Sequence, residues 1–120
     1  MAAPGKQVIN VMGDAAFGTV GLDIETAVRA EIPILTIILN NSTMAIYSDS
    51  RFPYSVEKYN VKALSGQFSE VAQALGAFAE KVSDPNDIIP AIQRGLEVTQ
   101  NGRPAVLEFI TREEGEYSKF

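Results

Sequence analysis

Two apolar runs dominate the first third of the chain, and each leads into a short polar motif. The first run, Val8–Met12, is followed by Gly13-Asp14-Ala15, and the second, Ile34–Leu39, is followed by Asn40-Asn41. Both runs are typical of strands, and the intervening segment has room for one helix, so the pattern predicts a strand–helix–strand unit. Because such crossovers are right-handed and join parallel strands, we expect both polar motifs at the carboxyl edge of one sheet.

The segment between these strands predicts a helix from Leu22 to Ala30, after a turn loosened by glycine. The apolar side chains Ile24, Ala27 and Val28 fall at i, i+3 and i+4. That spacing places them on one helix face, which we expect to pack on the sheet. The strand that follows is almost wholly apolar, as is typical of a central parallel strand covered on both faces.

A long stretch, Ser42–Gln67, shows no clear periodicity. Such stretches are usually functional or disordered. This one carries several aromatic residues, which argues against a simple disordered linker; they are Tyr47, Phe52, Tyr54 and Tyr59. We expect a short helix starting near Met44, with the remainder crossing the carboxyl edge of the sheet.

The rest of the chain alternates helices and strands. Helical spacing begins at Phe68 and ends at Gly76, strands are predicted at Ala77–Val82 and Ala105–Ile110, and Asp84-Pro85 is a strong helix start. The expected buried face of that last helix consists of Ile88, Ile89, Ile92 and Leu96. The element order predicts an α/β fold, with a parallel sheet and helices on both faces, as in part of a doubly wound domain.

Composition narrows the chemistry. The 120 residues include no cysteine and no histidine. Thiolate and histidine metal sites, cysteine nucleophiles, Ser-His-Asp triads and histidine general bases are therefore excluded within this chain. Any metal must be held by oxygen atoms, which favours magnesium or calcium.

Charge and hydropathy bear on partners. The formal net charge of −5 argues against nucleic acid and anionic membranes as partners. No apolar run approaches the roughly 20 residues of a membrane span. The cytoplasm is the expected location.

The two polar motifs are the strongest candidates for a site. Neighbouring strands lie about 4.8 Å apart, so the Asp14 carboxylate and the Asn41 amide oxygen are positioned to share one small cation. Such oxygen ligands suit a magnesium ion that also binds water and a diphosphate. Each motif alone is typical of an ordinary turn, and it is their joint placement that indicates a site. The glycine spacing does not match a dinucleotide fingerprint or a P-loop.

These motifs resemble the diphosphate-binding motif of thiamine-diphosphate-dependent enzymes, in which Gly-Asp-Gly is followed at this spacing by Asn-Asn. The wider run is similar to the acetolactate synthase and pyruvate decarboxylase-like branch. Matching segments include Gly13-Asp14-Ala15-Ala16-Phe17, Glu31-Ile32-Pro33-Ile34, Gly76-Ala77-Phe78-Ala79 and Gly102-Arg103-Pro104-Ala105-Val106-Leu107-Glu108. The resemblance covers nearly the whole chain.

The resemblance implies magnesium ligands at Asp14, Asn41 and the main-chain carbonyl of Thr43. It also implies diphosphate contacts, through backbone donors, around the cofactor-binding residues Gly13, Ala15, Ala16, Met44 and Ala45. Three of these positions depart from the commonest family pattern. Ala15 replaces a glycine, Ala16 stands where a serine is frequent, and Ala45 lies near a common glycine. No departure removes a metal ligand.

The implied parent is an enzyme that decarboxylates a 2-oxo acid or joins it to a second carbonyl compound, a lyase or transferase. The implied cofactors are thiamine diphosphate and Mg²⁺, and the implied partners are a 2-oxo acid, further copies of the chain or a pyrimidine-binding domain that carries the activating glutamate. We expect residues 1–120 to be a single domain and a fragment of the family's diphosphate domain, inactive alone. The alternatives are a non-catalytic remnant and a free-standing phosphate- or nucleotide-binding α/β module.

Overall fold

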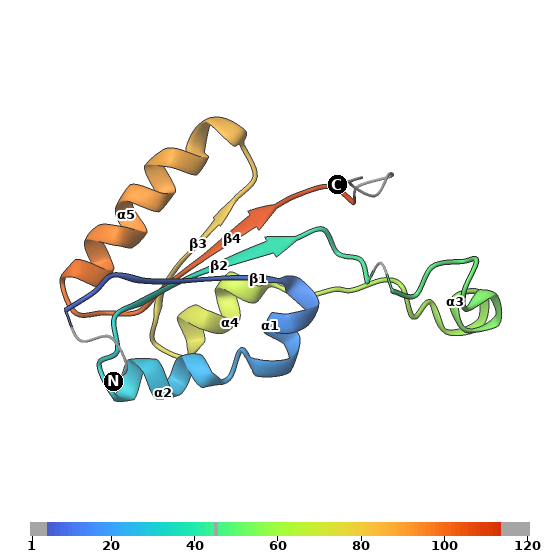
Figure 1. The fold of residues 1–120 in the computed structure, drawn as a ribbon, viewed down its shortest axis with the longest axis horizontal. Coiled ribbons are helices and arrows are strands. Elements are labelled where there is room, and N and C mark those ends of the chain that lie inside the picture. The colour runs from blue at the N-terminus through green and yellow to red at the C-terminus, as the bar shows by residue number, and fades with distance from the viewer. Residues whose placement is uncertain (1–4, 45, 114–120) are drawn as a thin grey trace.

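A computed structural model describes residues 5–44 and 46–113 as an α/β arrangement built on parallel strands (Figure 1). The first half contains β1 (Val8–Gly13), α1 (Asp14–Val20), α2 (Asp23–Arg29), β2 (Ile34–Asn40) and α3 (Pro53–Tyr59). The second half contains α4 (Phe68–Ala74), β3 (Phe78–Val82), the short 3₁₀ helix η1 (Pro85–Asp87), α5 (Ile88–Gln100) and β4 (Ala105–Ile110). The chain thus alternates strands and helices, as the sequence predicted.

The described strands form one parallel sheet in the order β1-β2-β4-β3. In β1 and β2, Val8 pairs with Ile34 and Gly13 pairs with Leu39, so the two strands end at the same edge. Central β2 lies between β1 and β4, in agreement with its apolar sequence. The predicted parallel pairing, the α/β class and all four strands are confirmed, with β3 beginning one residue later than predicted.

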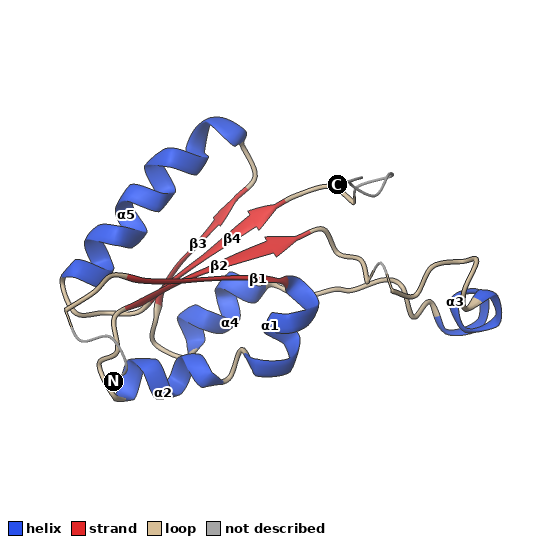
Figure 2. Ribbon diagram, viewed as in Figure 1, coloured by secondary structure: helices blue, strands red, loops and turns tan. Residues whose placement is uncertain are grey.

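Helices cover both faces of the sheet. Helix α5 lies against one face, and α1, α2 and α4 lie against the other (Figure 2). The α5 face is packed around Leu35, Leu107 and Ala91. Its α5–β3 side also carries an ion pair in which the Glu80 carboxylate raises the pKa of the Arg94 guanidinium. Helices therefore bury the centre of the sheet on both faces.

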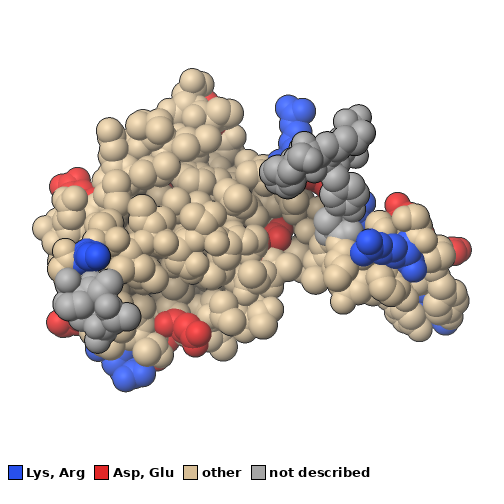
Figure 3. Space-filling model, in the orientation of Figure 1, with Lys and Arg blue, Asp and Glu red and all other residues tan. Residues whose placement is uncertain are grey.

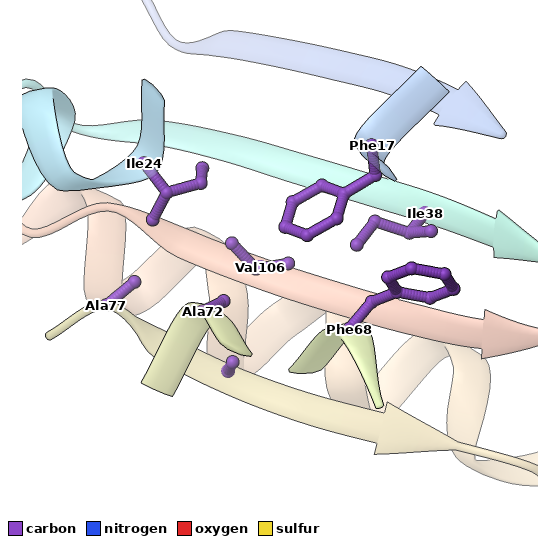
Figure 4. Close-up of a cluster of buried hydrophobic side chains, with 8 residues drawn as sticks. Phe17, Ile24, Ile38, Phe68, Ala72, Ala77 and Val106 are labelled. Carbon is purple, nitrogen blue, oxygen red and sulfur yellow. The ribbon is translucent and has the colours of Figure 1, made fainter. Parts of the chain in front are cut away.

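The opposite core joins α1, α2 and α4 to β2 and β4 (Figure 4). The rings of Phe17 and Phe68 meet edge to face, with centroids 5.7 Å apart. This geometry is favourable for two aromatic quadrupoles. Ile24 and Ala27 are buried on the predicted face of α2. The contact of Phe17 with Phe68 fixes α1, and with it the residue that begins this helix, Asp14.

Three helix predictions need correction. The connection between β1 and β2 holds two helices rather than one, because Asp14–Val20 is already helical. Within the described residues, no helix begins near Met44; an antiparallel bridge joins Thr43 to Ala63, and the Met44 carbonyl accepts a single turn bond from the Tyr47 N–H. In α5, Ile88 and Ile89 are exposed and the most deeply buried residues are Ala91, Gly95 and Thr99. Small residues at these positions let the helix approach the sheet closely.

Part of Ser42–Gln67, the segment without periodicity, projects from the sheet and carries α3 (Figure 1). We call this projection the arm. No residue of α3 is buried, and Tyr54 and Tyr59 are among its exposed aromatic side chains. In the same orientation the sheet body presents a largely uncharged face, and Lys and Arg side chains are visible on the arm (Figure 3). Among the described helices, none is long and apolar enough to cross a bilayer.

Candidate functional site

The two polar motifs meet at the carboxyl ends of β1 and β2. A cavity of about 640 Å³ opens there. Its lining includes seven of the predicted site residues: Gly13, Asp14, Ala15, Ala16, Asn41, Thr43 and Met44. The eighth, Ala45, lies outside the described residues. Parallel pairing of the two strands accounts for this convergence of segments far apart in the sequence.

Asp14 is the acidic group of the cavity, and only 3% of its surface is exposed. It begins α1, where a negative charge is favoured by the helix dipole. Its Oδ1 accepts a hydrogen bond of 2.8 Å from the backbone N–H of Ala15, and its Oδ2 accepts one of 2.8 Å from that of Ser42. A carboxylate has about four acceptor positions, so lone pairs remain for a cation.

Asn41 forms a tight turn with the residue two positions ahead. Its Oδ1 accepts hydrogen bonds from the backbone N–H of Thr43, at 3.0 Å, and from the Thr43 hydroxyl, at 3.1 Å. Asparagine is suited to turns of this kind because its side chain bonds to its own backbone. Within the described residues, no hydrogen bond ends on the Thr43 carbonyl oxygen. That oxygen is therefore available as a ligand.

Two of the predicted backbone donors are already engaged. The Met44 N–H donates to the Lys62 carbonyl at 2.8 Å, within the same bridge that pairs Thr43 with Ala63. The Ala15 N–H donates to Asp14, as described above. Their role toward a diphosphate remains a prediction, and it requires these two N–H groups to exchange or share their acceptors.

The donor set fits magnesium. It comprises the Asp14 carboxylate, the Asn41 amide oxygen and the Thr43 carbonyl, which are hard oxygen ligands on residues that line one cavity. The Asn41 oxygen must release one of its two Thr43 donors to bind a metal ion. The described residues contain no cluster of three or more His, Cys, Asp or Glu side chains. Any metal at this edge would thus be held by a mixed set with one carboxylate, leaving positions for water and a phosphate.

The segment after β4 also contributes to the site, which the sequence motifs did not predict. Thr111 and Arg112 also line the cavity, and the Thr111 N–H donates to the Asn40 carbonyl at 2.8 Å. Arg112 is a basic residue in the lining of the same cavity as Asp14, and among the described residues no hydrogen bond or ion pair of its side chain is found. The place of these two residues in the sequence could have predicted this, because they follow β4, which pairs in parallel with β2 and ends at the same edge of the sheet.

A second cavity, of about 510 Å³, lies beside α2 and contains none of the predicted site residues. Its walls are mostly apolar and include Asn10, Thr36 and Ile24. Asp23 also lines it. This position makes Asp23 a suitable control for Asp14, since the two acidic residues lie in different cavities.

Comparison with known proteins shows the family to which this chain belongs. Residues 1–109 match the family described as "Thiamine pyrophosphate enzyme, C-terminal TPP binding domain". Among curated proteins, the chain is 31% identical to a probable acetolactate synthase of Mycobacterium bovis, over 92% of this chain and 20% of that protein. It is also 31% identical to a sulfoacetaldehyde acetyltransferase of Alcaligenes xylosoxydans xylosoxydans, over 96% of this chain and 20% of that protein.

A solved structure gives the same picture. The thiamine diphosphate-dependent 4-hydroxybenzoylformate decarboxylase of Rhodococcus jostii RHA1 superposes with a TM-score of 0.79 at 26% identity. The match covers 96% of this chain and 21% of that one. The chain thus spans about a fifth of the length of the proteins it resembles.

Proposed function

Because this chain belongs to the family of C-terminal TPP-binding domains of thiamine pyrophosphate enzymes, we propose that its cavity at the ends of β1 and β2 binds the diphosphate of thiamine diphosphate through Mg²⁺. The observation that carries the proposal is the direct bond from the Ser42 N–H to Asp14. This bond joins the Gly-Asp motif to the residue that follows the Asn-Asn motif, at the edge where Asp14, Asn41 and Thr43 line one cavity.

In this proposal Asp14, Asn41 and the Thr43 carbonyl hold the metal ion. The ion joins the acidic edge to an anion that Asp14 alone would repel, so metal and diphosphate bind together. Backbone groups around Gly13, Ala15, Ala16, Met44 and Ala45 are the proposed contacts to the diphosphate, for which the Ala15 and Met44 N–H groups must exchange or share their present acceptors. Arg112 lines the same cavity and adds an attractive charge for the phosphate oxygens.

Thiamine diphosphate, when bound, supplies the nucleophilic carbon and the electron sink of the reaction. The contribution of this chain is to bind and orient one end of the cofactor. With no histidine or cysteine, it offers no side chain that titrates near neutral pH without a large pKa shift. The proposed catalytic role is therefore positioning, and the proton-transfer groups come from elsewhere in the assembly.

We further propose that the complete enzyme is a 2-oxo-acid decarboxylase or carboligase of the acetolactate synthase type. The names of the matched relatives support this, since they include an acetolactate synthase, an acetyltransferase and a decarboxylase. Its partners would be a 2-oxo acid and a pyrimidine-binding domain, supplied by another region or another subunit of a cytoplasmic homo-oligomer.

The specificity of the cavity tests the proposal. Calorimetric titrations would compare thiamine diphosphate, thiamine, ATP and NAD, each with and without Mg²⁺. We expect magnesium-dependent binding of thiamine diphosphate and none of thiamine, which lacks the diphosphate. Tighter binding of ATP or NAD would instead support the alternative of a general phosphate- or nucleotide-binding module.

A further inference from the structure

Strand β4 contains a buried acid, Glu108, that lies outside the two polar motifs. Glu108 is fully buried, among neighbours that include Val106 and Leu107. Its Oε1 accepts a hydrogen bond of 2.7 Å from Asn40 Nδ2, and its Oε2 accepts one of 2.8 Å from the backbone N–H of Ser69. An ionised carboxylate is costly to bury, so its retention in a strand core calls for a physical reason.

The acceptor character of Glu108 fixes the orientation of Asn40. A carboxylate only accepts hydrogen bonds, so Asn40 must present its amide nitrogen to Glu108. The amide oxygen of Asn40 then points toward the following turn. It accepts hydrogen bonds from the backbone N–H of Ser42, at 2.9 Å, and from the Ser42 hydroxyl, at 3.2 Å.

Ser42 is the residue that needs such support. It lies between Asn41 and Thr43. Its backbone φ of +57° is in the left-handed region, which residues other than glycine rarely adopt. Its N–H is shared between Asn40 Oδ1 and Asp14 Oδ2. A continuous line of hydrogen bonds therefore runs from Glu108 through Asn40 and Ser42 to Asp14.

We propose that Glu108 is a positioning residue for the metal site: by fixing the amide of Asn40, it holds the Ser42 turn in the shape that presents Asn41 and Thr43 beside Asp14. Glu108 itself touches neither metal nor cofactor. The proposal rests on the proposed function for its consequence in binding, whereas its effect on the turn is independent of any ligand. Partners that orient metal ligands typically change metal affinity by about 10- to 100-fold when they are replaced.

Exchanging the two polar groups gives the sharpest test. In Glu108→Gln, the amide oxygen accepts from only one of Asn40 and Ser69. The Ser69 donor is a fixed backbone N–H whereas the Asn40 amide can turn, so we expect the new NH2 group to face Asn40 and to disturb its bond to Ser42. In Asn40→Asp, two carboxylates face each other. In the double variant Asn40→Asp/Glu108→Gln, the acceptor and donor exchange places. The new carboxylate then accepts from both the new amide and the Ser42 N–H, and the net charge is unchanged.

Two readouts are measured on the 120-residue chain and its variants. The first is hydrogen exchange of the Ser42 amide by NMR, without any ligand. The second is the affinity for thiamine diphosphate in the presence of Mg²⁺. Thr99→Val is the control, because Thr99 is also buried and hydrogen-bonded but bonds to Gln7, away from the cavity. This variant reports destabilisation alone.

We expect each single variant to speed exchange of the Ser42 amide by about tenfold, the equivalent of about one hydrogen bond. We expect each also to weaken cofactor binding at least tenfold, with both properties recovered in the double variant. Thr99→Val should change neither relative to other amides of the sheet. If Glu108→Gln does not fold, recovery of the fold and of Ser42 protection in the double variant supports the proposal.

Unchanged Ser42 exchange in a folded Glu108→Gln variant would overturn the proposal, as would failure of the exchanged pair to restore it. The failure of the proposed function looks different. In that case the unmodified chain does not bind thiamine diphosphate with Mg²⁺ at all, while the Ser42 amide still responds to the exchange of groups.

Discussion

The backbone N–H of Ser42 donates a 2.8 Å hydrogen bond to the Oδ2 of Asp14, a residue 28 positions earlier in the chain. This contact connects the end of β2 to the start of α1 across the edge of the sheet. It brings the carboxylate and the Asn41 turn together before any ligand is added. The fold therefore brings the two motifs to one edge, and metal binding at Asn41 still requires its Oδ1 to release a Thr43 donor.

Two glycines predict opposite effects on stability. Gly18 lies within α1, and a Cβ there meets nothing within 4 Å, so Gly18→Ala should stabilise the chain by about 0.5–1 kcal/mol through helix propensity. At Gly95 in α5, a Cβ would lie 2.9 Å from Leu35 Cδ1 and 3.2 Å from Leu107 Cδ1. Overpacking of this buried interface costs about 1–3 kcal/mol, so Gly95→Ala should be destabilising.

Urea unfolding of the two variants measures both effects, with the unmodified chain as reference. Equal stabilisation by both substitutions would show that α5 does not depend on the close approach that Gly95 allows.

The projecting arm should be the first region cut by protease. Arg51 and Lys58 are exposed on a segment in which α3 buries no residue, so local opening there is inexpensive. We expect limited digestion with trypsin, followed by mass spectrometry, to cleave at these two sites before it cleaves at Lys81 in β3 or Arg94 in α5. Earlier cleavage within the sheet or α5 would show that the arm is held more firmly than its exposure indicates.

Much of the fold follows from the sequence because its strongest signals are local. The apolar runs predicted the strands, and their polar ends predicted a shared edge. Asp84 begins the last helical segment as expected, with its side chain accepting a hydrogen bond from the N–H of Asn86. These features depend on periodicity and on capping chemistry, which neighbouring residues determine.

The features that the sequence did not predict depend on packing or on distant contacts. Helix α1 lacks a side-chain cap and contains Gly18, so it is fixed mainly by the contact of Phe17 with Phe68. The extended course at Thr43 depends on its bridge to Ala63. The role inferred for Glu108 depends on Asn40, 68 positions earlier in the chain. No local pattern encodes such pairings.

The chain alone should not turn over substrate. We expect no decarboxylation or carboligation by the 120 residues, even with saturating thiamine diphosphate and Mg²⁺, because the chain has no histidine to act as acid or base near neutral pH. Incubation with pyruvate and related 2-oxo acids, with assays for carbon dioxide and acetoin-type products, checks this. Turnover clearly above that of the cofactor alone would reveal a catalytic group within this chain.

The central claim is that Asp14 couples magnesium to the diphosphate, and calorimetry of thiamine diphosphate with and without Mg²⁺ tests it most directly. Three proteins are compared: the unmodified chain, Asp14→Ala, and the control Asp23→Ala, whose acid lines the other cavity. Thermal unfolding first establishes that each is folded. We predict binding that requires Mg²⁺ in the unmodified chain and in Asp23→Ala, and loss of that coupled binding in Asp14→Ala. Equal losses in both variants, or binding that does not depend on Mg²⁺, would contradict the account.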